Sequence, residues 1–254
     1  MTTRAQQITD WMKDCLATAG SRGIAVGLSG GIDSAVVIAL AAAAAPGQVV
    51  GVIMPCHSDP QDEVDARLAA DHFGVRAVRL DLAPTYDRLV ADLGATLGAL
   101  PGPQRAMEPN DPAARLPLAN VKPRLRMASL YFVANSLNYL VAGTGNRSEL
   151  AIGYFTKYGD GGVDLLPIGR LLKSEVRILA RELGVPSPII DKAPSAGLWL
   201  GQTDEAEMGF SYADLEAYLT SGAAAVAPQL ATHIARLEKV SDHKRALPPM
   251  PPEA

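Results

Sequence analysis

Residues 27–35, with the sequence GLSGGIDSA, combine two adjacent glycines, two serines and a carboxylate in one turn. The apolar run before the turn, 24–28, predicts a strand, and the alanine-rich run after it, 32–45, predicts a helix. Gly30 and Gly31 have no Cβ, so their backbone N–H groups can approach a bulky anion closely. The start of the helix adds unpaired N–H groups and the positive end of its dipole. The turn therefore predicts a binding site for phosphate or pyrophosphate.

Asp33 lies at the start of this predicted helix. A carboxylate beside a phosphate site repels the ligand unless a cation lies between them, which indicates Mg²⁺ bridging Asp33 and phosphate oxygens. The alternative is that Asp33 caps the helix. The turn is neither a Walker A loop, because no Gly-Lys-Ser/Thr follows, nor a dinucleotide-binding G-x-G-x-x-G.

A second polar turn, 143–149 with the sequence GTGNRSE, follows a short apolar run at 139–142. Ligands of open α/β sheets bind beyond the carboxyl ends of the strands, where both turns are expected to lie. Glu149 offers a second carboxylate for the same cation, and Thr144 a hydroxyl for a nucleotide. Taken alone, the turn is better explained as a capped helix start with Glu149 near its third position. Pairing with the first turn strengthens the metal interpretation.

Three basic residues are predicted close to the start of a helix, where a positive charge is repelled by the helix dipole. Arg124 and Arg126 are predicted in the first turn of a helix that begins at Pro123 and ends near Asn138, and Lys173 opens the next helix. A phosphate or carboxylate ligand would explain the two arginines, and a solvated basic face is an equally good alternative.

Residues 155–164 are rich in glycine and carry charges at Lys157, Asp160 and Asp164. This composition predicts either a plain surface loop or a mobile loop that orders over a ligand.

Strands and helices alternate over the first hundred residues, which predicts a doubly wound parallel sheet flanked by helices. A proline-rich loop is expected at 101–117, with five prolines, and a proline-rich tail at 248–254. We expect one domain, 1–254, with a small helical C-terminal part. The remaining expected elements are helices at 8–20, 63–73, 86–100, 171–183 and 223–242, strands at 48–54 and 75–82, an irregular stretch at 188–202, and two short helices capped by Asp204 and Ser211.

The chain has 254 residues, of which 48% are hydrophobic and 20% are charged, and its net charge is −4. This charge argues against a general nucleic-acid binder or a protein of anionic membrane surfaces. Cys15 and Cys56 have no metal-ligand spacing and suit a reducing compartment. The longest apolar run, 34–45, is too short to cross a membrane, so we expect a soluble, cytoplasmic protein.

The first turn resembles the pyrophosphate loop of the N-type ATP pyrophosphatases, which split ATP into AMP and pyrophosphate. A longer series of motifs, spread over about residues 24 to 249, resembles the ammonia-dependent NAD synthetase family. The segments at 154–173 and 193–212 are much more specific than the loop. In chain order the motifs are SGGIDSA, NVKPRLRM, GTGNRSE, YFTKYGDGGVDLLPIGRLLK, APSAGLWLGQTDEAEMGFSY and HKRALPP.

This resemblance implies a Rossmann-like fold of the adenine nucleotide alpha hydrolase type and a ligase that forms a C–N bond. Deamido-NAD, ATP and ammonia would become NAD, AMP and pyrophosphate through an adenylated carboxylate. It also implies Mg²⁺, a homodimer with the deamido-NAD site near the subunit interface, and no protein nucleophile.

Carried over by motif, the expected site residues form three sets. The ATP set is Gly27, Leu28, Ser29, Gly30, Gly31, Ile32, Asp33, Ser34, Thr144, Lys173 and Ser195; the deamido-NAD set is Arg124, Lys157, Asp164, His243 and Lys244; the Mg²⁺ ligands are Asp33 and Glu149. Asp33, Lys157 and Lys173 would act in catalysis.

Two positions depart from the family's pattern. Gly145 and Asn146 stand where many relatives carry Asp-His, which leaves an acidic interaction unaccounted for. Ser195 replaces a commoner threonine and keeps the hydroxyl.

Three other interpretations compete with this one. Another ATP pyrophosphatase acting on tRNA should carry a basic face or a cysteine pair, and a glutamine-dependent NAD synthetase needs a glutaminase domain for which 254 residues leave no room. A glutaminase partner chain remains compatible. A non-catalytic nucleotide sensor would not need Glu149, Lys157 and Lys173 together.

Overall fold

The computed structural model describes residues 3–100, 112–195, 197, 199 and 201–251. Four parallel strands form one sheet in the order β3-β2-β1-β4. Their bounds are β1 Gly23–Leu28, β2 Val49–Ile53, β3 Arg76–Arg79 and β4 Tyr139–Ala142. β1 and β2 are almost wholly buried, as expected for continuous apolar runs covered on both faces. The predicted doubly wound α/β fold is confirmed.

β1 pairs with β2 on one side and with β4 on the other, with Ile24 opposite Val49 and Gly23 opposite Tyr139. The chain moves from β1 outward to β2 and β3 and then returns to add β4 on the opposite edge of β1. The carboxyl ends of β1 and β4 therefore form a topological switch point, the usual ligand crevice of such sheets. Both polar turns follow these two strands.

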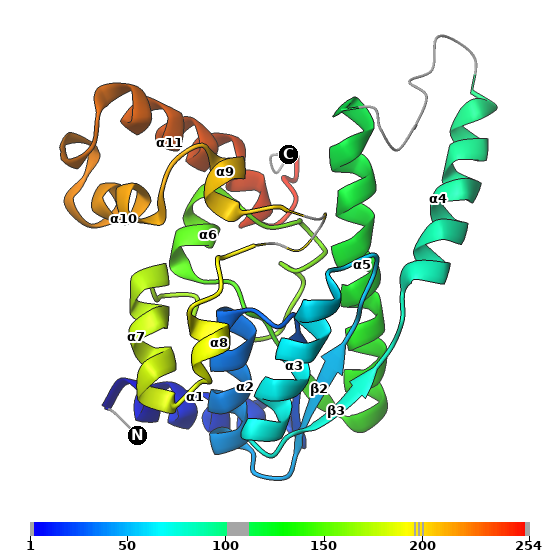
Figure 1. Cartoon of the computed structure of the whole chain (residues 1–254), viewed down its shortest axis with the longest axis vertical. Helices are drawn as coiled ribbons and strands as arrows, with labels where there is room; N and C mark the ends of the chain where they lie inside the picture. Colours follow the sequence, from blue (N-terminus) through cyan, green and yellow to red (C-terminus); the bar gives the residue numbers. More distant parts are fainter. Residues whose placement is uncertain (1–2, 101–111, 196, 198, 200, 252–254) are drawn as a thin grey trace.

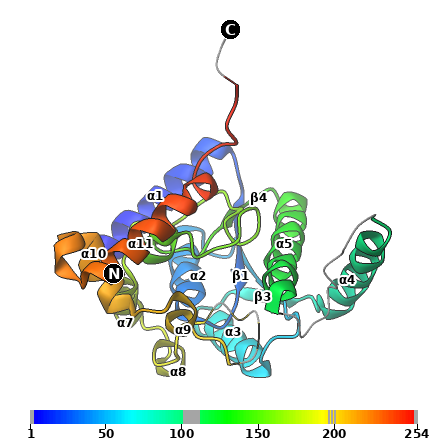
Figure 2. The ribbon, with the colours of Figure 1, turned by 90° about the horizontal axis from the view of Figure 1, so that it is seen from above.

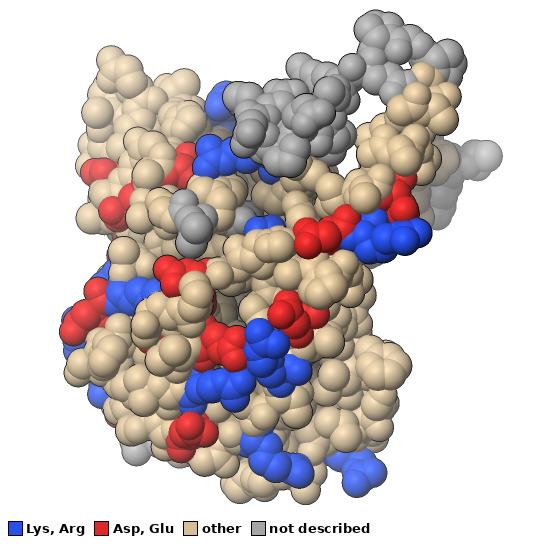
Figure 3. Space-filling view, turned by 45° about the vertical axis from the view of Figure 1, so that its right-hand side comes forward, with Lys and Arg blue, Asp and Glu red and all other residues tan. Residues whose placement is uncertain are grey.

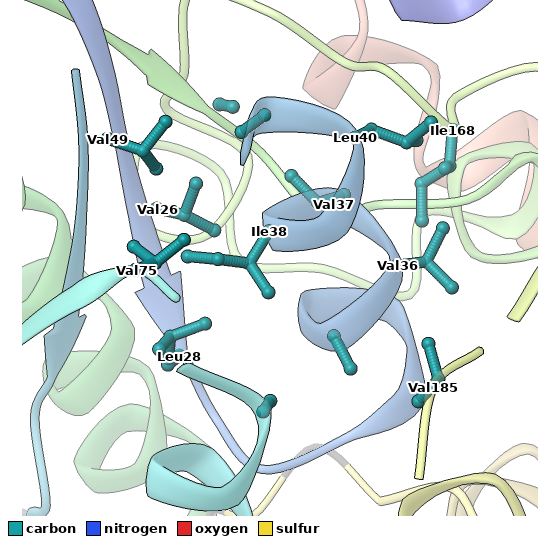
Figure 4. Close-up of a cluster of buried hydrophobic side chains, with 14 of the residues drawn as sticks. Val26, Leu28, Val36, Val37, Ile38, Leu40, Val49, Val75, Ile168 and Val185 are labelled. Carbon is teal, nitrogen blue, oxygen red and sulfur yellow. The ribbon is translucent and has the colours of Figure 1, made fainter. Parts of the chain in front are cut away.

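Helices cover both faces of the sheet (Figure 2). One face carries α1 Thr3–Ala19, α2 Ile32–Ala44, α3 Pro60–His72, α7 Lys173–Leu183 and α8 Ser187–Ile190, and the other carries α5 Pro112–Leu137 with α4 Ala83–Gly98 beyond it. In the larger core, Ile38 of α2 faces Val26 and Leu28 of β1, whereas Val36 on the other side of the helix faces Val185 (Figure 4). This packing fixes the start of α2, and with it Asp33, against the end of β1.

The C-terminal helices lie over the carboxyl ends of the strands (Figure 1). They have a core of their own that includes Ile152, Phe210, Leu215 and Ile234. The predicted small helical part is thus present and roofs the switch point. Its elements are α6 Arg147–Ile152, α9 Asp204–Met208, α10 Tyr212–Ser221, η1 Ala223–Ala225, α11 Pro228–Val240 and η2 Asp242–Lys244.

The helix expected to start at Pro123 begins eleven residues earlier, so the expected loop at 101–117 is wrong over its last six residues. Pro117 and Pro123 both lie inside α5, although each removes one helical hydrogen bond. Ala134 of the same helix is fully buried in the core that α5 forms with the sheet. The rest of the expected loop, 101–111, lies outside the described residues.

Smaller differences concern the ends of elements. Thr203, and not Asp204, caps α9, because its hydroxyl accepts the N–H of Ala206, whereas Ser211 caps α10 as expected. The stretch expected to be irregular at 188–202 contains most of α8. The expected tail has no helix or strand over 248–251, and its last three residues lie outside the described part.

Acidic and basic side chains are interleaved on the face drawn in Figure 3. Among the helices that the structure describes, none has the length and apolar character needed to span a bilayer.

Candidate functional site

The turn after β1 is held by its own serines. The N–H of Gly31 donates to Ser29 Oγ at 3.2 Å, and Ser34 Oγ donates to the carbonyl of Gly31 at 2.9 Å. Gly31 occupies the cap position of α2 without a side-chain cap, so the interpretation of Asp33 as the cap is wrong. The carboxylate is free to act elsewhere.

Gly30 has φ +78° and lies against the backbone of α3. A Cβ at this position would stand 2.3 Å from the carbonyl oxygen of Asp62. We expect Gly30→Ala to displace the turn and raise the KM for ATP at least about tenfold, because the amides would leave their positions. Steady-state kinetics with varied ATP measures this.

Gly47 provides the matched control, since it has φ +74° and nothing within 4 Å of an added Cβ. Gly47→Ala carries the same left-handed backbone cost of about 1–2 kcal/mol but lies at the opposite end of the sheet. Equal KM values for ATP in both variants would show that the turn does not hold the nucleotide.

Asp33, Glu149 and Lys173 meet at the switch point. Lys173 Nζ donates to Asp33 Oδ2 at 2.5 Å and to Glu149 Oε1 at 3.2 Å. The lysine side chain is 3% exposed, and each carboxylate is 16% exposed. Three residues predicted from separate motifs are therefore in direct contact.

Asn146 joins the two polar turns. Its Nδ2 donates to Asp33 Oδ1 at 3.1 Å, and its Oδ1 accepts the N–H of Glu149 at 3.1 Å. Glu149 Oε2 in turn accepts the N–H of Asn146 at 3.2 Å, which completes a capping box. Glu149 thus caps α6 with one oxygen and faces Lys173 with the other, so the two interpretations of this turn are compatible. Asn146, which stands where the family's pattern has another residue, thus donates a hydrogen bond that orients Asp33.

Burial and charge shift the pKa values of this cluster. Burial raises the pKa of Glu149 to about 7, Lys173 opposes the shift and Asp33 adds to it. Burial alone would lower the pKa of Lys173, but the Asp33 and Glu149 carboxylates outweigh it and the pKa is raised. The ammonium group is accordingly charged at neutral pH.

The two carboxylates fit a magnesium ion whose remaining coordination positions are filled by a bound substrate and water. Asp33 Oδ2 and Glu149 Oε1 converge on one point, where the Lys173 ammonium lies. Mg²⁺ is commonly held by one or two carboxylates together with substrate phosphates and water. No group of three potential metal-ligating side chains occurs within the described ranges.

A second group of predicted residues surrounds the segment 153–164. Lys157 Nζ donates to the carbonyl of His243, and Arg124 donates to the carbonyl of Lys157 at 3.3 Å. Lys244 Nζ donates to the carbonyls of Gly153 and Phe155, both at 2.7 Å. Four residues expected to contact deamido-NAD therefore gather around one glycine-rich segment.

Asp164 belongs to the same segment but is already engaged. Its Oδ1 accepts the hydroxyl of Tyr131 at 2.9 Å, and its Oδ2 accepts the N–H of Val141 in β4 at 2.8 Å. Burial, together with Asp164, raises the pKa of Tyr131. The carboxylate anchors the glycine-rich segment to the sheet.

Three other predicted residues lie apart from these groups. Thr144 is partly buried in the turn after β4, and exposed Ser195 accepts the N–H of Gly197 at 3.1 Å. Arg126 is in the middle of α5 and donates to the carbonyl of Met54 and to Ser58 Oγ, both at 3.1 Å. Arg126 therefore ties α5 to the end of β2, and the argument from a helix start does not hold for Arg124 or Arg126.

Sequence reasoning assigned no role in the site to two residues of the roof, Tyr212 and Asp204, and predicted Asp204 only as a helix cap. Tyr212 donates its hydroxyl to Asp204 Oδ2 at 2.8 Å and lies 3.5 Å from Glu149 Oε1. Neither residue has a spacing that marks it, since both reach the site only through the packing of α9 and α10.

Comparisons with known proteins identify the family of this chain. The sequence profile of the family described as NAD synthase matches residues 4–248. The NH(3)-dependent NAD(+) synthetase of Carboxydothermus hydrogenoformans is 49% identical over 248 residues, covering 98% of this chain and 96% of that protein.

Two solved structures are also similar. The NMN synthetase from Francisella tularensis superposes with a TM-score of 0.87 at 35% identity, covering 98% of this chain and 97% of that one. The NH3-dependent NAD synthetase from Campylobacter jejuni superposes with a TM-score of 0.77 at 26% identity, covering 98% of both chains.

Proposed function

Because the chain belongs to the NAD synthase family, we propose that it amidates deamido-NAD with ammonia, using ATP and releasing NAD, AMP and pyrophosphate. It is a ligase that forms a C–N bond. The observation that carries the proposal is the contact between Asp33, Glu149 and Lys173 beside a glycine turn at the switch point.

The reaction needs an activated carboxylate. The nicotinate carboxylate accepts ammonia poorly, because oxide is a poor leaving group. Its attack on the α-phosphorus of ATP expels pyrophosphate and forms a mixed anhydride with AMP. Ammonia then attacks the carbonyl carbon, AMP leaves, and the nitrogen loses a proton. Positioning and charge neutralisation are sufficient for both steps.

Each part of the site has a role in this scheme. The amides of residues 27–34 and Lys173, together with Thr144 and Ser195, hold the phosphates and nucleotide of ATP. Asp33 and Glu149 would hold Mg²⁺, which would supply positive charge to neutralise the phosphates. Arg124, Lys157, Asp164, His243 and Lys244 hold deamido-NAD, and Lys157 also neutralises charge in the reaction. The segment 155–164 excludes water from the adenylate.

The proposed function is tested by incubating the protein with ATP, Mg²⁺ and deamido-NAD, and comparing ammonia with glutamine as the nitrogen donor. We expect NAD and stoichiometric pyrophosphate with ammonia and none with glutamine alone. ATP binding without pyrophosphate release would instead identify a nucleotide sensor. Activity with glutamine only after addition of a glutaminase would indicate a partner in trans.

A mononucleotide is the second candidate substrate, because the NMN synthetase structure superposes with the higher of the two TM-scores, 0.87. The curated relative at 49% identity is an NAD(+) synthetase, which favours the dinucleotide. Competition between deamido-NAD and nicotinate mononucleotide in one reaction decides this, since the ratio of products gives the ratio of kcat/KM values.

We further propose that the protein acts in the cytoplasm as a homodimer. A cavity of about 500 Å³ lined by apolar side chains, among them Val78 and Leu80, opens between the sheet edge and α5. Phe132 on its rim is 75% exposed. Helix α4 buries no residue and also exposes the apolar side chains of Leu93 and Leu97. A second copy of the chain would cover this apolar face.

Phe132→Glu is expected to weaken the dimer by about 30-fold or more, because a charge replaces an aromatic anchor. Sedimentation velocity over a concentration series measures this. Ile178→Glu is the matched control, because Ile178 is 55% exposed on α7, on the opposite face of the sheet. Equal association by both variants would rule out this surface as the interface.

A further inference from the structure

Asp204 carries a buried oxygen that no protein donor satisfies. The residue is 3% exposed. Its Oδ2 accepts the hydroxyl of Tyr212 at 2.8 Å, whereas Oδ1 has no hydrogen-bond partner among the described residues. Leaving a charged acceptor buried and unsatisfied is costly, and such groups commonly mark the place of a ligand.

The two hydroxyls beside Asp204 have one proton each, and each hydroxyl faces two carboxylates. A tyrosine hydroxyl has one proton and accepts through its lone pairs. Tyr212 donates its proton to Asp204 Oδ2, and Tyr154 donates its own to Glu207 Oε2 at 2.7 Å. The Tyr154 hydroxyl is also within hydrogen-bonding reach of the Asp204 carboxylate, and Glu149 Oε1 lies 3.5 Å from the hydroxyl of Tyr212, so the carboxylate oxygens outnumber the protons that these hydroxyls can donate. The unused hydrogen-bonding positions of these carboxylates and hydroxyls are therefore acceptors.

The surrounding charge also favours a cation. Asp33, Glu149 and Asp204 interact electrostatically with one another and with Lys173, the one cation they share. Negative charge is therefore in excess. The ring of Tyr212, with Lys173 Nζ 5.2 Å from its centre, adds a face that attracts positive charge. A small cation with several N–H donors matches these acceptors.

We propose that Asp204 Oδ1, with the hydroxyls of Tyr154 and Tyr212, docks ammonium, which becomes ammonia, the nitrogen donor of the reaction, when one of its protons passes to the Asp204 carboxylate. The inference rests on the proposed function. This position adjoins the Glu149–Lys173 contact, so the bound nitrogen would wait next to the activated carboxylate.

A cavity beside Glu207 lies next to this group. Its volume is about 330 Å³, and it is lined by Arg115, Trp199, Gln202 and Glu207, among others. Glu207 Oε2 accepts from Gln202 at 2.6 Å and from Tyr154 at 2.7 Å, and Tyr154 lies beside Asp204. Glu207 and Tyr154 therefore link the wall of this cavity to Asp204 through side-chain hydrogen bonds.

Asp204→Asn is the test, because it removes the charge while an amide oxygen can still accept from Tyr212. We expect the KM for ammonia to rise about tenfold or more, with the KM values for ATP and deamido-NAD unchanged. Release of pyrophosphate in a single turnover without ammonia should also be unchanged. Hydroxylamine, which is largely neutral at pH 8, should react with the variant nearly as well as with the wild type.

The controls separate docking from folding. Asp214→Asn removes an exposed carboxylate of α10 that caps through Ser211, and it should leave the KM for ammonia unchanged. Tyr154→Phe keeps the ring and should raise this KM by a smaller factor. An unchanged ammonia KM in Asp204→Asn, or an equal loss of ammonia-free pyrophosphate release, would overturn the proposal.

Binding is measured without turnover by thermal unfolding. Ammonium chloride should raise the unfolding midpoint of the wild type above that in sodium chloride of equal ionic strength, and should not do so for Asp204→Asn. The same rise in potassium chloride would show a general monovalent cation site and would overturn the proposal. A wild type that responds to ammonium but makes no NAD would overturn the proposed function and leave the docking site supported.

Discussion

Asp33→Asn is expected to lower the rate of pyrophosphate release by about 10²–10³-fold, the range found when one charge-stabilising group is removed from an active site. The side chain keeps its shape, so the contact of Asn146 with position 33 can persist. The charge that faces Lys173, and that would face Mg²⁺, is lost. A magnesium titration of pyrophosphate release should also show a half-saturation at least about tenfold higher.

A control variant accompanies the magnesium titration. Asp10→Asn removes a carboxylate that pairs with Lys13 on the exposed face of α1, and it should match the wild type in rate and magnesium dependence. Pyrophosphate release by Asp33→Asn with unaltered magnesium dependence would contradict the assignment of Asp33 as a metal ligand.

The sequence predicted the sheet because its signals are local. The apolar runs that became β1 and β2 are buried on both faces, and each is closed by a glycine or proline turn. The start of α5 was predicted wrongly because Pro123 satisfies the local rule for a first helical residue. Packing of the whole helix against the sheet decided otherwise, and local rules do not contain that information.

The pairing of Asp33 with Glu149 followed from one topological rule, that strand ends at a switch point share a crevice, whereas Lys173 was assigned to the site only through the family resemblance. Asn146 bridges to Asp33 across 113 residues, and its spacing relative to Glu149 marks only a helix cap. Asp204 enters the site through the packing of α9 beneath Tyr212. Such contacts depend on how the roof is seated on the sheet, which a single sequence does not specify.

Lys173→Met is expected to abolish measurable NAD formation and to lower the free energy of unfolding by about 3 kcal/mol in EDTA, because two carboxylates would remain near each other without the buried ammonium. Lys173 is 2% exposed, so water cannot replace it easily. Mg²⁺ would then meet no competing ammonium between Asp33 and Glu149. The variant should therefore gain more in unfolding midpoint from Mg²⁺ than the wild type does.

The pH dependence of Lys173→Met has a defined sign. Lys173 lowers the pKa of Glu149, which is about 7 in the wild type and 4.5 ordinarily, so the variant should have a value above 7. A carboxyl whose pKa is raised by folding contributes stability that is present below 4.5 and is lost as the pH rises through the folded value. In EDTA, the deficit of the variant should accordingly be smaller at pH 6 than at pH 8.

Lys239→Met, in the exposed last turn of α11, is the matched control and should show neither the magnesium effect nor the pH effect. If Lys173→Met lost stability equally at pH 6 and pH 8 and did not respond to Mg²⁺, its effect would come from packing alone. The ammonium would then not be what holds the two carboxylates together. A magnesium-responsive, pH-dependent deficit instead means that the lysine occupies, in the ligand-free protein, the position between the carboxylates that the metal takes with ATP.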